Sequence, residues 1–331
     1  SEYMQKHYPD YEIVWAFKQP QHFKSLEKRN IKTVKYLYPR FLRICLTSKF
    51  IVTNSEIPAW FPIMKRQVYI NTWHGGGAYK RVGAAYQKET PGKQIRAEIA
   101  REMPCIYVSS SKAFTDLTIH QSFHHYGTIL SCGMPRNDMF VRQNRPQLVS
   151  KIRTYYHLPQ DAHILLYAPT YRDSKTASEY LFDCSAIKKA LTERFGGNWY
   201  FMFRMHYFVI DQLKDKAEYI DASAYPDMQE LLYASDVLIT DYSSSMWDFA
   251  LAGKPCFLYA TDLKFYDMKR GFYSDIHTWP SPWLKTQVNW NIVSNPLIPK
   301  NIVQMLRSIS QIWEVMKQDM PANISANSLL K

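Results

Sequence analysis

A histidine followed by three glycines is the first pattern in the chain that points to chemistry. His74 comes after the apolar run 68–70 in the stretch VYINTWHGGG, so we expect it at the carboxyl end of a β-strand, the edge where α/β sheets bind ligands. An imidazole at that edge can act as a general base near neutral pH. Gly75 and Gly76 let the backbone approach a ligand, and Lys80 and Arg81 make the turn electropositive. A structural histidine that caps a glycine turn is the alternative, and the glycines do not match the GxGxxG pattern of dinucleotide binding.

A serine-rich turn between a predicted strand and a predicted helix is the second pattern. The stretch ASDVLITDYSSSMWD has an apolar run at 237–239, a polar turn that opens with Asp241, and helical spacing from 246 to 252. Ser243, Ser244 and Ser245 present hydroxyl and N–H groups at a helix start, where the helix dipole favours an anion such as phosphate. Taken alone, these serines also describe an ordinary helix N-cap.

Basic residues follow other strands predicted in the second half of the chain. Arg172 comes just after Pro169, which ends the predicted strand 163–168. Arg204 and His206 are two positions apart in the predicted strand 199–209, so we expect both side chains on one face, toward one ligand. A solvated edge strand is the alternative. Arg270 lies in a predicted aromatic loop over 264–276.

Strands and helices that alternate along the chain are expected to position these residues. Predicted strands at 12–17, 31–37, 49–54, 68–71 and 105–110 are separated by helical or loop segments, which is typical of a parallel α/β sheet. The polar, basic stretch VRQNRPQLVS marks a domain boundary, so we predict domains at 1–143 and 144–300, with a closing helix and tail at 301–331. The helical pattern at 1–10 suggests that a segment with the first strand precedes residue 1.

The composition limits the class of partner. The 331 residues carry a formal net charge of +12, which favours an anionic partner: nucleic acid, a phosphate-rich substrate or an anionic membrane surface. Five scattered cysteines without a CxxC motif argue for reduced thiols and against zinc. No apolar run approaches the ~18 to 20 residues of a membrane span. We therefore expect a chain that is soluble, or that binds a membrane only at its surface.

Taken together, seven ordered motifs give the chain a family resemblance. They are NTWHG, YVSSS, GMPRND, YAPTYRD, FRMH, ITDYSS and the DL..Y...RGFY pattern, and they extend over nearly the full length. The chain resembles the CDP-glycerol glycerophosphotransferase family, which includes teichoic acid primases and polymerases and related capsule polymerases. The resemblance implies a GT-B-type fold of two Rossmann-like domains, with the donor bound mainly by the second domain. It also implies chemistry without a metal or other cofactor, because the CDP-alcohol is a substrate.

The resemblance assigns roles to individual residues. His74 matches the proposed catalytic base, and His206 matches a histidine that contacts the donor pyrophosphate. The donor-binding set implied by the motifs comprises Arg172, Arg204, Asp241, Ser243, Ser244, Ser245 and Arg270. The acceptor-side set comprises Gly75, Gly76, Lys80 and Arg81. The Thr-Pro-Leu-Lys sequence that commonly follows WHG in the family is absent here, which affects the expected acceptor more than the reaction type.

The resulting expectation is a transferase that moves glycerol phosphate, or ribitol phosphate, from its CDP derivative to a hydroxyl of a lipid-linked or polymeric acceptor, with release of CMP. We expect it in the cytoplasm, at the inner face of the bacterial membrane, in contact with anionic lipids and without nucleic acid. Two alternatives remain at this stage. One is a glycosyltransferase that uses a nucleotide-sugar donor, and the other is a non-catalytic polyanion-binding protein.

Overall fold

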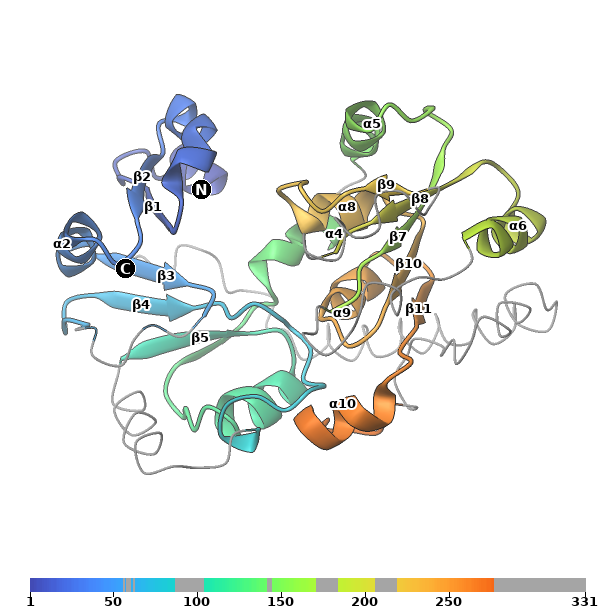
Figure 1. The fold of residues 1–331 in the computed structure, drawn as a ribbon. Helices are drawn as coiled ribbons and strands as arrows, with labels where there is room; N and C mark the ends of the chain where they lie inside the picture. The colour runs from blue at the N-terminus through green and yellow to red at the C-terminus, as the bar shows by residue number, and fades with distance from the viewer. Residues whose placement is uncertain are drawn as a thin grey trace.

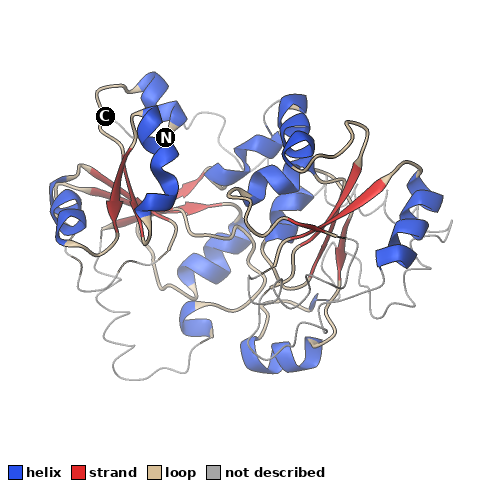
Figure 2. Ribbon diagram, turned by 45° about the horizontal axis from the view of Figure 1, so that its top comes forward, coloured by secondary structure: helices blue, strands red, loops and turns tan. Residues whose placement is uncertain are grey.

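The computed structural model describes residues 1–55, 57, 61, 63–86, 104–141, 145–170, 184–205 and 219–276. These residues form two parallel α/β lobes, linked by a connecting segment at residues 135–141 (Figures 1 and 2). The first lobe comprises the described residues before 135, and the second comprises those from 145 onward.

The first lobe contains two parallel sheets. β1 (Val14–Phe17) pairs with β2 (Lys32–Lys35), and a four-stranded sheet has the order β3-β4-β5-β6. Its strands are β3 (Phe50–Thr53), β4 (Val68–Asn71), β5 (Cys105–Ser109) and β6 (Ile129–Ser131). The helices of this lobe are α1 (Glu2–His7), η1 (Pro20–Arg29), α2 (Pro39–Thr47), η2 (Gly83–Ala85) and the π-helix η3 (Phe114–His120).

The second lobe is built on a five-stranded parallel sheet with the order β11-β10-β7-β8-β9. The strands are β7 (His163–Tyr167), β8 (Trp199–Phe203), β9 (Ile220–Asp221), β10 (Val237–Thr240) and β11 (Cys256–Leu258). Its helices are α5 (Pro146–Tyr155), α6 (Cys184–Phe195), α8 (Met228–Ala234), α9 (Ser245–Ala250) and α10 (Leu263–Arg270). The connecting segment contributes η4 (Pro135–Asn137) and α4 (Asp138–Val141).

The core of the second lobe lies on both faces of its sheet. Because successive side chains of a strand point to opposite faces, Leu166 packs in one apolar cluster and Leu165 in the other. Leu231 of α8 belongs to the first cluster, and Ile187 of α6 belongs to the second. Helices therefore cover both faces, which explains why its central strands read as continuous apolar runs.

Two local predictions need correction. β8 ends at Phe203, so Arg204 and Met205 lie beyond the strand that was predicted to run to 209. Its neighbour β7 ends at Tyr167, and Pro169 lacks the N–H that would continue the pairing. The predicted loop around Arg270 is also wrong, since Arg270 is the last residue of α10. The predicted domain boundary at 143/144 and the tail at 301–331 fall outside the described residues.

Candidate active site between the two lobes

The His74 imidazole is held at the carboxyl edge of the first lobe. β4 ends at Asn71, Trp73 takes a left-handed conformation (φ 52°), and His74 follows as an exposed residue. Its Nδ1 lies 3.1 Å from the Asn54 carbonyl oxygen, just beyond the end of β3. Because a carbonyl oxygen can only accept a hydrogen bond, Nδ1 carries the proton in this contact. In the neutral imidazole, Nε2 then has the free lone pair and can accept a proton.

The surroundings favour the neutral form of this histidine. His74 remains accessible to solvent, but neighbouring atoms displace part of the water around its ring, and this desolvation lowers the pKa of His74 below its ordinary value, although the hydrogen bond with Asn54 opposes that shift. The positive charges of Arg136, Lys80 and Arg270 lower the pKa of His74 further. A histidine with a lowered pKa is deprotonated at neutral pH, which is the state that a general base requires.

The glycines after His74 let the first lobe approach helix α9. A Cβ on Gly75 would lie 3.1 Å from Ser244 Cβ, and one on Gly77 would lie 2.4 Å from Trp247 Cδ1. A Cβ on Gly76 would meet Met134 Cγ at 2.9 Å, within the first lobe. The close approach that the glycines were expected to give a ligand is therefore used here for contact between the lobes. It places His74 one residue from a direct contact with the serine turn.

The serine turn opens helix α9 as predicted, one residue earlier than expected. Ser243 Oγ accepts hydrogen bonds from the Ser245 N–H (3.3 Å) and the Ser245 hydroxyl (3.0 Å). The backbone N–H groups of Ser243 and Ser244 make no hydrogen bond to another described residue. Ser243 and Ser244 are both partly exposed, so these groups can serve an anion at the junction of the lobes.

Asp241 holds the backbone of this turn. Its Oδ1 accepts hydrogen bonds from the N–H groups of Thr170 (2.8 Å) and Tyr242 (2.5 Å), and the residue is only 2% exposed. Asp241 therefore ties the segment after β7 to the turn after β10. Direct contact between Asp241 and a donor remains a prediction from the sequence.

The predicted acceptor-side cations reach the second lobe. Lys80 Nζ donates to the Tyr242 carbonyl (3.2 Å), and Arg81 Nε donates to the Phe272 carbonyl (3.2 Å). A bridge between Lys80 and Phe272 joins the two segments through the backbone as well. Lys80 and Arg81 thus hold the lobes together, whatever further contact they make with an acceptor.

The predicted donor cations occupy different positions. Arg204 turns its guanidinium toward the chain after β9, where it donates to the carbonyls of Ala222 (3.2 Å) and Tyr225 (2.6 Å). Arg270 lies 3.9 Å above the ring of Tyr86 in the first lobe, and its Nε has no hydrogen-bond partner among the described residues. Arg172 and His206 lie outside the described residues, so their predicted roles stay predictions.

The connecting segment supplies site residues that the sequence reasoning missed. Arg136 makes an ion pair of 2.7 Å with Asp248 of α9 and donates to the backbone carbonyl of His74. Asn137 Nδ2 donates to the other oxygen of Asp248 (2.7 Å), and Gln229 of α8 bonds both Asn137 and Asp248. Asp248 is 3% exposed, so the carboxylate at the centre of this network is buried where the lobes meet. In the sequence, only the PRN residues of the GMPRND motif indicated that this segment is functional. Nothing in the local sequence shows that Arg136 and Asn137 contact α9.

Within the described residues, no group of three or more His, Cys, Asp or Glu side chains has the arrangement of a metal site. None of the described helices has the length and apolar character needed to cross a membrane.

Comparison with known proteins places this geometry in a family. The chain is 30% identical over 297 residues to the teichoic acid poly(glycerol phosphate) polymerase of Bacillus subtilis, a match that covers 86% of this chain and 40% of that protein. It is 33% identical over 285 residues to the polymerase of the same name from Staphylococcus epidermidis, covering 82% of this chain and 39% of that one. The chain therefore spans about two fifths of the length of these relatives.

A solved structure agrees on the fold. The wall teichoic acid polymerase TagF, as a histidine variant, superposes with a TM-score of 0.77 at 29% identity, covering 95% of this chain and 78% of TagF. The same variant soaked with CDPG gives a TM-score of 0.76. The two-lobed GT-B-type fold expected from the motifs is confirmed. The family model for CDP-Glycerol:Poly(glycerophosphate) glycerophosphotransferase matches residues 1–290, and the chain belongs to that family.

Proposed function

We propose that this chain transfers glycerol phosphate from CDP-glycerol to a hydroxyl of a polymeric glycerol-phosphate acceptor and releases CMP. The observation that carries the proposal is the contact between the two motif segments. Gly75, next to the neutral imidazole of His74, packs on Ser244 at the start of α9. A base and an anion-binding turn from different lobes thus meet at one place. Membership of the glycerophosphotransferase family indicates which reaction this pair performs, namely transfer of a glycerol phosphate group.

In the proposed reaction the acceptor hydroxyl gives its proton to Nε2 of His74. The hydroxyl oxygen forms a bond to the phosphorus that bears the glycerol, and the bond from that phosphorus to the bridging oxygen breaks. CMP leaves with the electron pair of that bond. The Asn54 carbonyl accepts the Nδ1 hydrogen bond throughout and stabilises the imidazolium that forms, which later releases its proton to water.

The leaving CMP needs positive charge and N–H donors. Phosphoryl transfer depends mainly on positioning and electrostatic stabilisation. Lys80, Arg136 and Arg270 surround His74 closely enough to affect its pKa, and the N–H groups of Ser243 and Ser244 are available to an anion. We propose that these groups, together with Arg172 and His206, neutralise the pyrophosphate, and that the reaction runs without a metal ion.

We further propose that the +12 net charge attracts an anionic membrane surface and a lipid-linked form of the acceptor.

Transfer assays with alternative donors test the proposal. The protein is incubated with a glycerol-phosphate oligomer and either CDP-glycerol, CDP-ribitol or a UDP-sugar, and nucleotide release is followed by mass spectrometry. The proposal expects CMP from CDP-glycerol in amounts equal to the units added, with EDTA present or absent. Turnover of the UDP-sugar alone would favour the glycosyltransferase alternative and contradict the proposal.

Nucleotide binding gives an independent test. A ligand that binds the folded state stabilises it by mass action, so CMP and CDP should raise the melting temperature. UMP and UDP at the same concentrations serve as matched controls. A larger shift with UDP than with CDP would contradict the proposed donor.

A further inference from the structure

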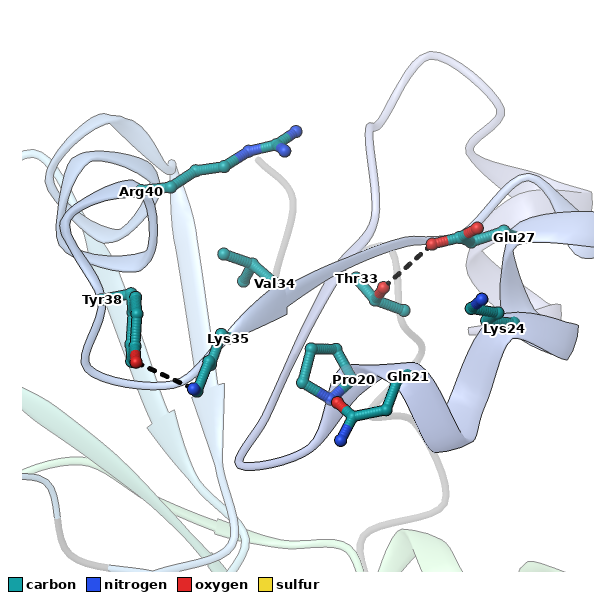
Figure 3. Close-up of a pocket in the computed structure, with 9 residues that line it drawn as sticks. All are labelled: Pro20, Gln21, Lys24, Glu27, Thr33, Val34, Lys35, Tyr38 and Arg40. Atoms are coloured by element: carbon teal, nitrogen blue, oxygen red, sulfur yellow. Dashed lines mark hydrogen bonds between the residues drawn. The ribbon is translucent and has the colours of Figure 1, made fainter.

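A pocket of about 360 Å³ lies in the first lobe among residues that the proposed reaction does not use. Its walls come from the start of η1, from β2 and from the start of α2 (Figure 3). η1 follows the carboxyl end of β1, and α2 follows that of β2. The pocket therefore lies at the carboxyl ends of the β1–β2 pair.

The pocket and His74 belong to the same lobe. Helix α2 starts at the carboxyl end of β2, packs on that strand and ends just before β3. Tyr11, ahead of β1, lies against Phe50 at the start of β3, with ring centroids 5.7 Å apart. The β1–β2 pair thus adjoins β3, and Asn54, which holds the His74 imidazole, follows the carboxyl end of β3. A long molecule whose end reaches His74 can extend over this lobe toward the pocket.

Cations dominate the lining of the pocket. The lining contains three basic side chains, those of Lys24, Lys35 and Arg40. It contains one carboxylate, that of Glu27, which accepts a hydrogen bond from the Thr33 hydroxyl (3.2 Å). Figure 3 shows Lys24 and Arg40 on opposite sides of the pocket. The arrangement of charges suits an anion that lies between the two walls.

These cations differ from others close to them in sequence. Arg29 pairs with Glu2 at 2.6 Å, and Lys32 pairs with Glu12, so both are neutralised locally. Lys24 and Arg40 make no ion pair or hydrogen bond with a described residue. Two exposed charges on one pocket are thus available to a ligand.

Lys35 is a fixed member of the set. Its Nζ donates to the Tyr38 hydroxyl (2.8 Å) and lies 4.2 Å from the centre of the Tyr38 ring. One of its three protons is used there, and the other two remain for an anion. Because the ammonium is already held in place, a ligand that binds it loses less side-chain entropy.

The remaining lining suits a polyol. Gln21 offers an amide at the rim, and buried Val34, 5% exposed, lies at the base beside Pro20. Phosphate oxygens fit the cations, hydroxyl groups fit the amide, and the carbon backbone fits the apolar base. A chain of polyol units joined by phosphodiesters carries all three kinds of group.

We propose that this pocket binds a phosphodiester segment of the acceptor chain, behind the terminal hydroxyl that reacts at His74. The proposal rests on the proposed function for the identity of the acceptor. The pocket would then increase the affinity of the protein for long acceptors over short ones. A lipid headgroup carries the same phosphodiester chemistry, so the test must separate the two sources.

The first test measures binding without turnover. A soluble glycerol-phosphate oligomer is titrated into the protein by calorimetry, with no CDP-glycerol present. The double variant Lys24→Ala/Arg40→Ala should bind roughly tenfold more weakly, which is about 1.4 kcal/mol for the pair, because it removes two cations that an anionic chain would contact. Lys188→Ala/Lys189→Ala removes two exposed charges from α6 and is the matched control. Equal affinities of the wild type and the pocket variant would overturn the proposal.

The second test uses acceptor length and lipid. The ratio of kcat/KM for a long acceptor to that for a single-unit acceptor should fall about tenfold in the pocket variant, with KM for CDP-glycerol unchanged. Loss of binding to phosphatidylglycerol vesicles with an unchanged length ratio would assign the pocket to lipid and overturn the proposal. If the wild type released no CMP from CDP-glycerol, the proposed function would fail. The titration would still decide whether the pocket binds the oligomer.

Discussion

The two lobes differ in how tightly their sheets are packed. Every residue of β10 is buried, as are four of the five residues of β7, with apolar clusters on both faces. In the first lobe the two middle residues of β1 are exposed, and Val52 of β3 is 63% exposed. The turn attributed to the donor thus follows a strand buried on both faces, and the pocket attributed to the acceptor chain lies on the partly exposed strands β1 and β2. This difference is consistent with the proposed ligands, because the nucleotide has one size and the acceptor polymer varies in length.

The largest expected effect tests the difference in packing directly. Leu166→Ala in β7 removes a fully buried side chain and should lower the free energy of unfolding by about 2–5 kcal/mol. Val52→Ala is the control and should change it by less than about 0.5 kcal/mol. Both values come from urea denaturation. Similar losses in the two variants would show that the lobes are equally packed.

The ion pair at the junction should give the next largest effect. Arg136→Ala leaves the buried Asp248 carboxylate without its ion-pair partner, so we expect a loss of about 1–3 kcal/mol of stability together with reduced transfer. The pair of Lys151 with Glu230, in which the lysine is 56% exposed, is the comparison, and Lys151→Ala should cost less than about 1 kcal/mol. Denaturation midpoints of the two variants separate the cases. An equal cost for both would mean that burial of Asp248 adds nothing.

The contact of the glycine turn with α9 should be sensitive to a single methyl group. Gly77→Ala places a Cβ 2.4 Å from Trp247 Cδ1 and should destabilise the junction by about 1–3 kcal/mol. Trp247→Leu in the same chain should relieve part of this cost, because it removes the ring atoms that clash. A double-mutant cycle measures the coupling. Independent, additive effects would argue against this packing.

The smallest effect concerns pH. Because the pKa of His74 is lowered, the imidazole should become protonated only when the pH falls below the ordinary histidine value of about 6.5. The transfer rate should fall in that range, since the protonated ring cannot act as a base. Arg136→Gln removes a nearby positive charge, so it should raise the pKa of the acid limb in the kcat/KM profile. Lys151→Gln, at an exposed lysine of α5, is the control. A downward shift in Arg136→Gln would contradict the electrostatic assignment.

The sequence could predict what local patterns determine. Continuous apolar runs located β7 and β10, because strands buried on both faces need apolar residues at every position. The edge position of His74 followed from a strand that ends in a glycine turn. The sequence could not show that Arg136 reaches Asp248, since that pair joins residues 112 positions apart. The sequence also predicted Arg204 within a strand, because the residues around it are apolar and do not show where the neighbouring strand ends.

The central claim is that His74, held by Asn54 beside the serine turn, removes the proton of the acceptor hydroxyl. The most direct measurement is the single-turnover rate of CMP formation from CDP-glycerol and an oligomeric acceptor in His74→Gln, with His22→Ala as a surface control. We predict a fall of about 10²- to 10⁴-fold in His74→Gln, the usual contribution of a general base, with no change in the control. A rate in His74→Gln equal to that of the wild type would contradict the mechanism.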